Sequence, residues 1–150
     1  MNAVSTSLSI HRFWKALVTL SLCWALFVLW GCLTETGASG GLILRLFPFL
    51  KGFAYTDKLV HAGLHGVLAT LLWCTGVARA KAHVQHWTAA WALAIVLLCA
   101  AYGGVIELLQ ASLTTTRGAE WLDALANTTG ASLAVLLWQG LRALIIKKDS

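Results

Sequence analysis

Four long apolar stretches divide the chain, and none of them contains Asp, Glu, Lys or Arg. They cover residues 16–33, 59–78, 82–106 and 124–141. A helix of about 20 apolar residues crosses the hydrocarbon core of a bilayer, so each stretch is long enough to cross once. The pattern therefore predicts four membrane-spanning helices, at about residues 14–33, 58–78, 87–110 and 121–141.

The composition agrees with a chain that lies in a membrane. Hydrophobic residues make up 59% of the 150 residues and charged residues only 11%. A soluble domain carries about 25% charged residues, so little of the chain is left over for one. We expect residues 1–150 to form a single transmembrane domain, an all-α integral membrane four-helix bundle.

The basic residues flank the apolar stretches and form no long patch, although the net charge is +5. This placement argues against a nucleic-acid partner and is better explained by membrane topology. Arg12, Lys15, Arg79, Lys81, Arg142, Lys147 and Lys148 lie inside if the N-terminus is cytoplasmic, and Arg45, Lys51, Lys58 and Arg117 lie outside. Because cytoplasmic segments carry the excess of Lys and Arg, we expect an N-in, C-in topology.

The first outer loop contains a shorter apolar run, residues 42–50, which follows a glycine-rich turn. This run includes Arg45 and Pro48 and is too short to span a bilayer. We expect it to lie along the outer interface or to dip into it as a re-entrant segment, where it could cover polar groups beneath it.

Eight polar residues occur where the chain enters or leaves the predicted spans, and this topology puts all of them on the outer side. They are Asp57, Lys58, His61, Glu107, Gln110, Arg117, Asp123 and Asn127. Charge is tolerated at a bilayer edge, but Glu107 and Asn127 fall inside apolar runs, where polar groups without partners are costly. Such residues are candidates for a functional site.

Asp57 and His61 are four residues apart, so they share one face of a helix, and His65 continues that face one turn deeper. A carboxylate in this position can hold the tautomer of the imidazole. The plainer interpretation is a helix cap followed by an interfacial histidine, and the spacing alone does not decide between the two.

Glu107 and Gln110 are three residues apart near the outer end of the third span. Inside a bilayer, the carboxyl group of Glu107 either takes up a proton or pairs with a cation from another helix. Arg117, Lys58 and His61 are the cations on that side. A structural ion pair and a catalytic or ligand-binding role are equally consistent with this pattern.

Asp123 and Asn127 are four residues apart at the start of the fourth span, beside a small-residue face that includes Gly130. Because small residues let helices pack closely, we expect Asn127 to hydrogen-bond across a helix interface. The sequence does not decide between a structural and a ligand-binding role for Asp123. Glu120 is expected to lie in a solvated loop.

Taken in order, these motifs resemble the VanZ-like family of bacterial membrane proteins, named for a glycopeptide (teicoplanin) resistance determinant. The match lies in DKLVH at residues 57–61, GVIELLQ at 104–110, Arg117, and Asp123 and Asn127 ahead of TGA at 129–131. The resemblance implies a compact four-helix protein of the bacterial inner (cytoplasmic) membrane, with a poorly defined activity. Residues 111–116 depart from the family, which has an aromatic residue soon after the glutamine.

The function that we prefer from the sequence is engagement of an anionic envelope lipid or a lipid-linked cell-wall precursor, linked to glycopeptide resistance or to envelope homeostasis. Lys58, Arg117 and protonated His61 would coordinate a head-group phosphate. Glu107 and Asp57 would orient those cations or act as acid and base. The remaining ligand-binding candidates are Gln110, Asp123 and Asn127.

Two alternatives remain. In the first, the protein is a membrane enzyme that transfers or hydrolyses a phosphoryl or acyl group on such a lipid. His61 would then be the base or nucleophile, Glu107 a proton shuttle and Asp57 a further catalytic group. In the second, the polar residues only hold the helices together or bind a partner protein. The sequence does not decide whether any reaction is catalysed.

We expect no cofactor, because the chain contains no nucleotide-binding loop, zinc signature or other cofactor motif. Asp57, His61, Glu107 and Asp123 offer oxygen and imidazole donors for a divalent cation. Four such residues on three separate helices are weak evidence, and the sequence alone assigns no metal ligand.

Overall fold

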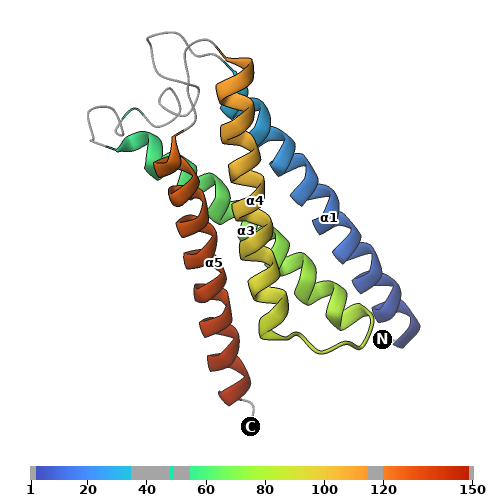
Figure 1. Cartoon of the computed structure of the whole chain (residues 1–150). Coiled ribbons are helices and arrows are strands. Elements are labelled where there is room, and N and C mark those ends of the chain that lie inside the picture. The colour runs from blue at the N-terminus through green and yellow to red at the C-terminus, as the bar shows by residue number, and fades with distance from the viewer. Residues whose placement is uncertain (1–2, 35–47, 49–54, 115–119, 149–150) are drawn as a thin grey trace.

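The structure is a computed structural model of the chain, and it describes residues 3–34, 48, 55–114 and 120–148. Within these residues the protein is all-helical. Its four helices are α1 (Ala3–Leu33), α3 (Thr56–Ala82), α4 (Ala89–Leu113) and α5 (Trp121–Lys148). Consecutive helices run in opposite directions, so α1 begins and α5 ends at the same end of the bundle (Figure 1). We call the opposite end, where α3 and α5 begin, the polar end.

Three of the described helices are long and apolar enough to cross a membrane, by length and composition. They are α1 from Ser9 to Leu33, α3 and α4. This confirms the all-helical fold and supports the spans predicted at 14–33, 58–78 and 87–110. The fourth predicted span, 121–141, lies within α5, but whether α5 crosses the bilayer stays a prediction.

The helices extend beyond the predicted spans. α1 begins at Ala3 rather than near residue 14, and α5 continues to Lys148 rather than ending near residue 141. The bounds predicted for the spans lie close to the charged residues that flank each apolar stretch. A helix forms its own backbone hydrogen bonds and can continue past the apolar core, because residues such as Arg12 are then solvated at the interface.

α3 packs against each of the other three helices, and its most extensive contact is with α5. The two backbones touch at Gly130, where an added Cβ would overlap the carbonyl oxygen of Ala62. A Cβ at Gly66 would lie 3.4 Å from the carbonyl oxygen of Gly130. Gly130 therefore provides the close helix approach that the small-residue face predicted.

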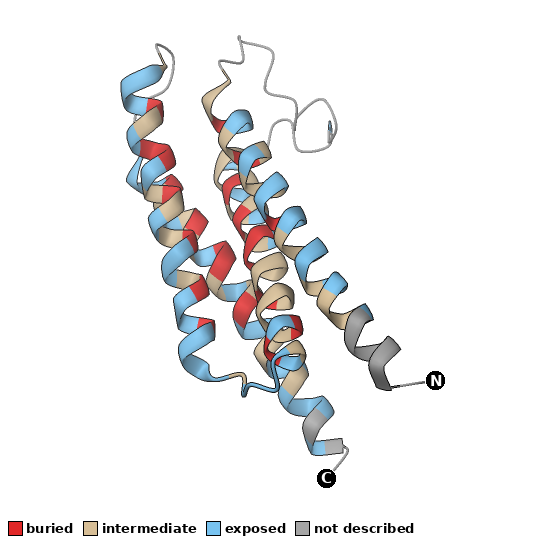
Figure 2. Cartoon of the chain, turned by 90° about the vertical axis from the view of Figure 1, so that its right-hand side faces the viewer, coloured by how far each residue is buried: buried red, intermediate tan, exposed pale blue. Residues whose placement is uncertain are grey.

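The buried residues lie on the helix faces turned toward the inside of the bundle, whereas the outer faces are exposed (Figure 2). The main core cluster consists of Leu68, Ala69, Trp73, Ala92, Ile95, Cys99, Ala131 and Val135. The exposed positions include many leucines, among them Leu97, Leu133 and Leu137. Such broad apolar surface is unusual on a soluble monomer and is expected where the surrounding solvent is lipid.

Away from the polar end, the core is closed by three tryptophans. Trp73 stacks on Trp138 and meets Trp87 edge-on, each at a ring-centroid distance of 5.6 Å. The indole N–H of Trp138 donates to Thr70 Oγ1 at 3.1 Å. These contacts join α3 and α5 to the segment just before α4, and they close the core at the end of the bundle away from the polar cluster.

Candidate functional site

Six ionic and amide side chains meet at the polar end. They come from the first turns of α3 and from the beginning of α5, because these two helices start side by side. We call this group the polar cluster: Asp57, Lys58, His61, Glu120, Asp123 and Asn127.

The ammonium group of Lys58 contacts three carboxylates. Its Nζ lies 2.5 Å from Glu120 Oε2, 2.5 Å from Asp123 Oδ1 and 3.5 Å from Asp57 Oδ2. The Asp123 side chain is 7% exposed, whereas that of Glu120 is 58% exposed. The ion pair with Asp123 therefore compensates a buried charge, and the pair with Glu120 lies close to solvent.

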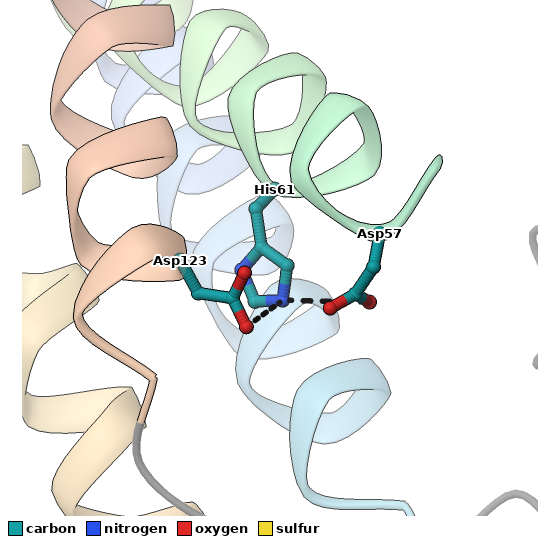
Figure 3. A group of neighbouring side chains, drawn as sticks. All are labelled: Asp57, His61 and Asp123. Atoms are coloured by element: carbon teal, nitrogen blue, oxygen red, sulfur yellow. Dashed lines mark ion pairs between the residues drawn. The ribbon is translucent and has the colours of Figure 1, made fainter. Parts of the chain in front are cut away.

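His61 is buried between the two helices, with 2% of its surface exposed. Its Nδ1 lies 3.2 Å from Asn127 Oδ1, and its Nε2 lies 3.7 Å from Asp123 Oδ2 and 3.9 Å from Asp57 Oδ1 (Figure 3). An amide oxygen only accepts hydrogen bonds, so this contact makes Nδ1 the protonated nitrogen. In neutral His61, the lone pair of Nε2 then points toward the carboxylates.

Asn127 is fully buried, and its hydrogen bond to His61 joins α5 to α3, as predicted. It also lies against α4, because a Cβ added to Gly103 would approach Asn127 Nδ2 to 2.7 Å. Among the described residues, Asn127 Nδ2 has no hydrogen-bond partner. Asn127 thus fixes the orientation of the imidazole from a position where three helices meet.

Glu107 adjoins the polar cluster from α4. It is 5% exposed, and its Oε2 accepts a hydrogen bond of 3.0 Å from the backbone N–H of Glu120. Its Oε1 has no hydrogen-bond partner within the described part of the chain. The carboxyl group therefore holds the start of α5 and keeps one oxygen for a further contact.

Gln110 was predicted as a ligand-binding residue, but its side chain points toward a different helix. Its Nε2 donates to the carbonyl oxygen of Cys32 at 2.8 Å, and the residue is 2% exposed. This hydrogen bond ties α4 to the end of α1. The side-chain amide of Gln110 is thus engaged in helix packing.

The structure therefore places the eight predicted residues in different surroundings. The structure brings five of them into the polar cluster, namely Asp57, Lys58, His61, Asp123 and Asn127. Glu107 adjoins the cluster through Glu120, and Gln110 binds α1. Arg117 lies outside the described residues, as does the predicted interfacial run 42–50 except for Pro48.

Glu120 lies in an exposed position before α5, as predicted, but its contacts with the polar cluster were not predicted. The residue is exposed, but its carboxylate contacts Lys58 and its backbone N–H binds Glu107. A usable signal was present, since Glu120 directly precedes α5 and lies three residues before Asp123.

His65, one turn beyond His61, is fully buried, and its Nδ1 lies 3.2 Å from the carbonyl oxygen of His61.

No family model, no curated protein and no solved structure matches this chain. The VanZ-like resemblance therefore stays a prediction that rests on the motifs themselves.

Proposed function

We propose that this chain is a multi-pass protein of the bacterial inner membrane, of the VanZ-like type, whose polar cluster engages the phosphate of an anionic envelope lipid or lipid-linked cell-wall precursor. Its physiological role would lie in glycopeptide resistance or envelope homeostasis. The observation that carries the proposal is the burial of several ionic groups together at one end of an apolar bundle. Ionic groups are costly there and typically mark functional positions.

The depth of the cluster supports a head-group ligand. Asp57 and Lys58 lie in the first turn of α3, and Glu120 immediately precedes α5. Helix ends of a membrane bundle lie near the interface, which is where lipid phosphates are found. A phosphate at this level can reach the polar cluster without entering the hydrocarbon core.

An exchange at Lys58 would accommodate the phosphate. The ion pair between Lys58 and Glu120 is solvent-exposed on the Glu120 side, and such pairs contribute only about 0–1 kcal/mol. A phosphate oxygen can therefore replace Glu120 on the ammonium group while Asp123 keeps its buried contact. Arg117, which precedes α5 in the sequence, would supply a second cation.

Lipid binding by the full chain in detergent tests this proposal, with phosphatidylglycerol and a polyprenyl phosphate as probes and phosphatidylcholine as the neutral comparison. We expect Arg117→Ala to weaken binding of the anionic probes about tenfold, as the loss of one charge-assisted contact predicts. Glu120→Gln should tighten binding, because it removes a competitor for Lys58. Arg79→Ala, at the opposite end of α3, is the matched control. Unchanged affinity in both Arg117→Ala and Glu120→Gln would count decisively against the proposal.

We also propose that both termini are cytoplasmic and that the polar end faces the cell exterior, because this orientation puts more basic residues inside. Single cysteines at Gln85 and Ser112, both exposed, test it in a background without the four native cysteines. A membrane-impermeant maleimide added to whole spheroplasts should label the residue-112 cysteine and spare the residue-85 cysteine. The reverse pattern would invert the topology.

A phosphoryl- or acyl-transfer activity is the second candidate. The specific feature that favours it is the Asn127–His61 hydrogen bond, which orients the imidazole so that Nε2 can accept a proton. In this case, His61→Ala should abolish turnover of a polyprenyl phosphate substrate while leaving its binding measurable. Release of inorganic phosphate by the wild-type chain is the direct readout.

A further inference from the structure

Three donor atoms from α3 and α5 converge in the polar cluster. One donor atom from each of Asp57, His61 and Asp123 lies within 4.8 Å of the other two, and the three side chains point toward one another (Figure 3). Two of these residues are one helical turn apart on α3, and the third faces them from α5. The arrangement therefore rests on two helices whose backbones are in direct contact at Gly130.

The contacts of Lys58 leave this arrangement intact. The ammonium group pairs with Asp57 Oδ2 and Asp123 Oδ1, which are the carboxylate oxygens that do not face His61. The other oxygen of each carboxylate is the one directed toward Nε2. Lys58 thus contacts one oxygen of each carboxylate, and the other oxygen of each is the one nearest to His61 Nε2.

His61 is prepared as a ligand on its other side. Nδ1 donates its hydrogen bond to Asn127 Oδ1, which leaves Nε2 unprotonated in the neutral ring. Histidines that bind metals usually donate their second ring N–H to such an oxygen, and this fixes both the tautomer and the ring orientation. The buried lone pair of Nε2 is then aimed at two negatively charged groups, which is unfavourable unless a cation lies between them.

The distances from His61 Nε2 to the two carboxylates are longer than those of a direct charged hydrogen bond. A protonated imidazole binds a carboxylate at about 2.7–2.9 Å, but Nε2 lies 3.7 and 3.9 Å from its two carboxylate oxygens. Donor atoms that share one divalent cation lie roughly 3.0–3.5 Å apart, given metal–ligand bonds near 2.1 Å. A small inward movement of either carboxylate would bring all three donors to metal-binding distance.

The charge balance points the same way. The three carboxylates around Lys58 carry three negative charges when ionised, against one positive charge on the ammonium group. Carboxylates therefore outnumber the ammonium group around Lys58, and a divalent cation beside Asp57 and Asp123 would add positive charge there.

We propose that Asp57, His61 and Asp123 form a binding site for one divalent first-row transition metal, of the Mn²⁺ or Zn²⁺ type. A mixed imidazole and carboxylate donor set suits these ions better than Ca²⁺, which takes oxygen ligands. Three protein ligands leave coordination positions for water or for a phosphate oxygen. The site does not depend on the proposed lipid function, but it would supply positive charge to a head-group phosphate.

Mn²⁺ binding to the full chain in lipid-free detergent tests the site, after the purified protein has been treated with a chelator. The wild-type chain is expected to bind one Mn²⁺, and pulsed electron paramagnetic resonance should detect a directly bound ¹⁴N nucleus. Asp57→Asn should weaken binding at least about tenfold. His61→Ala should remove the nitrogen coupling. His86→Ala, an exposed histidine between α3 and α4, is the control and should bind Mn²⁺ as the wild type does.

Asp57 is nearly half exposed, so Asp57→Asn should fold even if His61→Ala does not. The proposal is overturned if the wild-type chain binds no Mn²⁺, if Asp57→Asn binds it equally well, or if the bound ion shows no nitrogen coupling. Because no lipid is present, these outcomes are independent of whether the polar cluster engages a phosphate lipid.

Discussion

Replacing Lys58 with methionine is expected to lower the free energy of unfolding by about 3 kcal/mol, which is the usual cost of leaving a buried charge without its partner. The Asp123 carboxylate, 7% exposed and 2.5 Å from Lys58 Nζ, would lose this compensation. Reversible unfolding of the full chain in detergent, followed by circular dichroism, is the measurement. Glu120→Gln removes the exposed partner of Lys58 instead and should change stability by less than about 1 kcal/mol.

The double variant Lys58→Met/Asp123→Asn separates the buried charge from other effects of the substitution. If the buried carboxylate causes the loss, the double variant should recover most of the stability, because a neutral amide replaces the unpaired charge. Equal destabilisation of the single and double variants would show that the packing of the Lys58 stem, and not the ion pair with Asp123, stabilises the polar end.

Gly130→Ala should be the most damaging single methyl addition in the described helices. Its Cβ would overlap the carbonyl oxygen of Ala62, and a backbone atom cannot move aside without separating α3 from α5. Overpacking of this kind costs about 1–3 kcal/mol and sometimes more, and here it also pulls Asn127 away from His61. Thermal unfolding in detergent measures the first effect.

Gly140→Ala is the matched control, since Gly140 lies on the same helix and an added Cβ there meets nothing within 4 Å. It should leave stability unchanged or raise it slightly, because alanine favours a helix over glycine. If Gly130→Ala proved as stable as Gly140→Ala, the close approach of α3 and α5 would be wrong, and with it the geometry of the polar cluster.

The helices were predictable from the sequence because hydrocarbon demands long uninterrupted apolar stretches, and the spacing of Asp57 and His61 fixed their common face. The sequence could not show which helix each face meets. Gln110 shares a helix face with Glu107, yet it reaches back to α1, because the ends of α1 and α4 lie together. Glu120 is exposed, as predicted, but the sequence did not show that its carboxylate contacts Lys58, because exposure does not exclude an ion pair.

Structural roles and the proposed ligand-binding roles fall on different polar residues. Asn127 and Gln110 are almost completely buried and hold helices together through their side-chain amides. Asp57 and Glu120 are substantially exposed, and both contact the Lys58 ammonium group. If the polar residues served only for packing, the bundle would gain little from the ion pairs that Lys58 makes with the exposed carboxylates of Asp57 and Glu120, because exposed ion pairs stabilise weakly.

A high-resolution structure of the full chain, purified with its native lipids retained, tests the central claim most directly. The account predicts head-group density beside Lys58 and His61 at the polar end, with a phosphate oxygen at hydrogen-bonding or metal-binding distance from these residues. Lipid density confined to the outer apolar faces, with the polar cluster bonded only within itself, would contradict it.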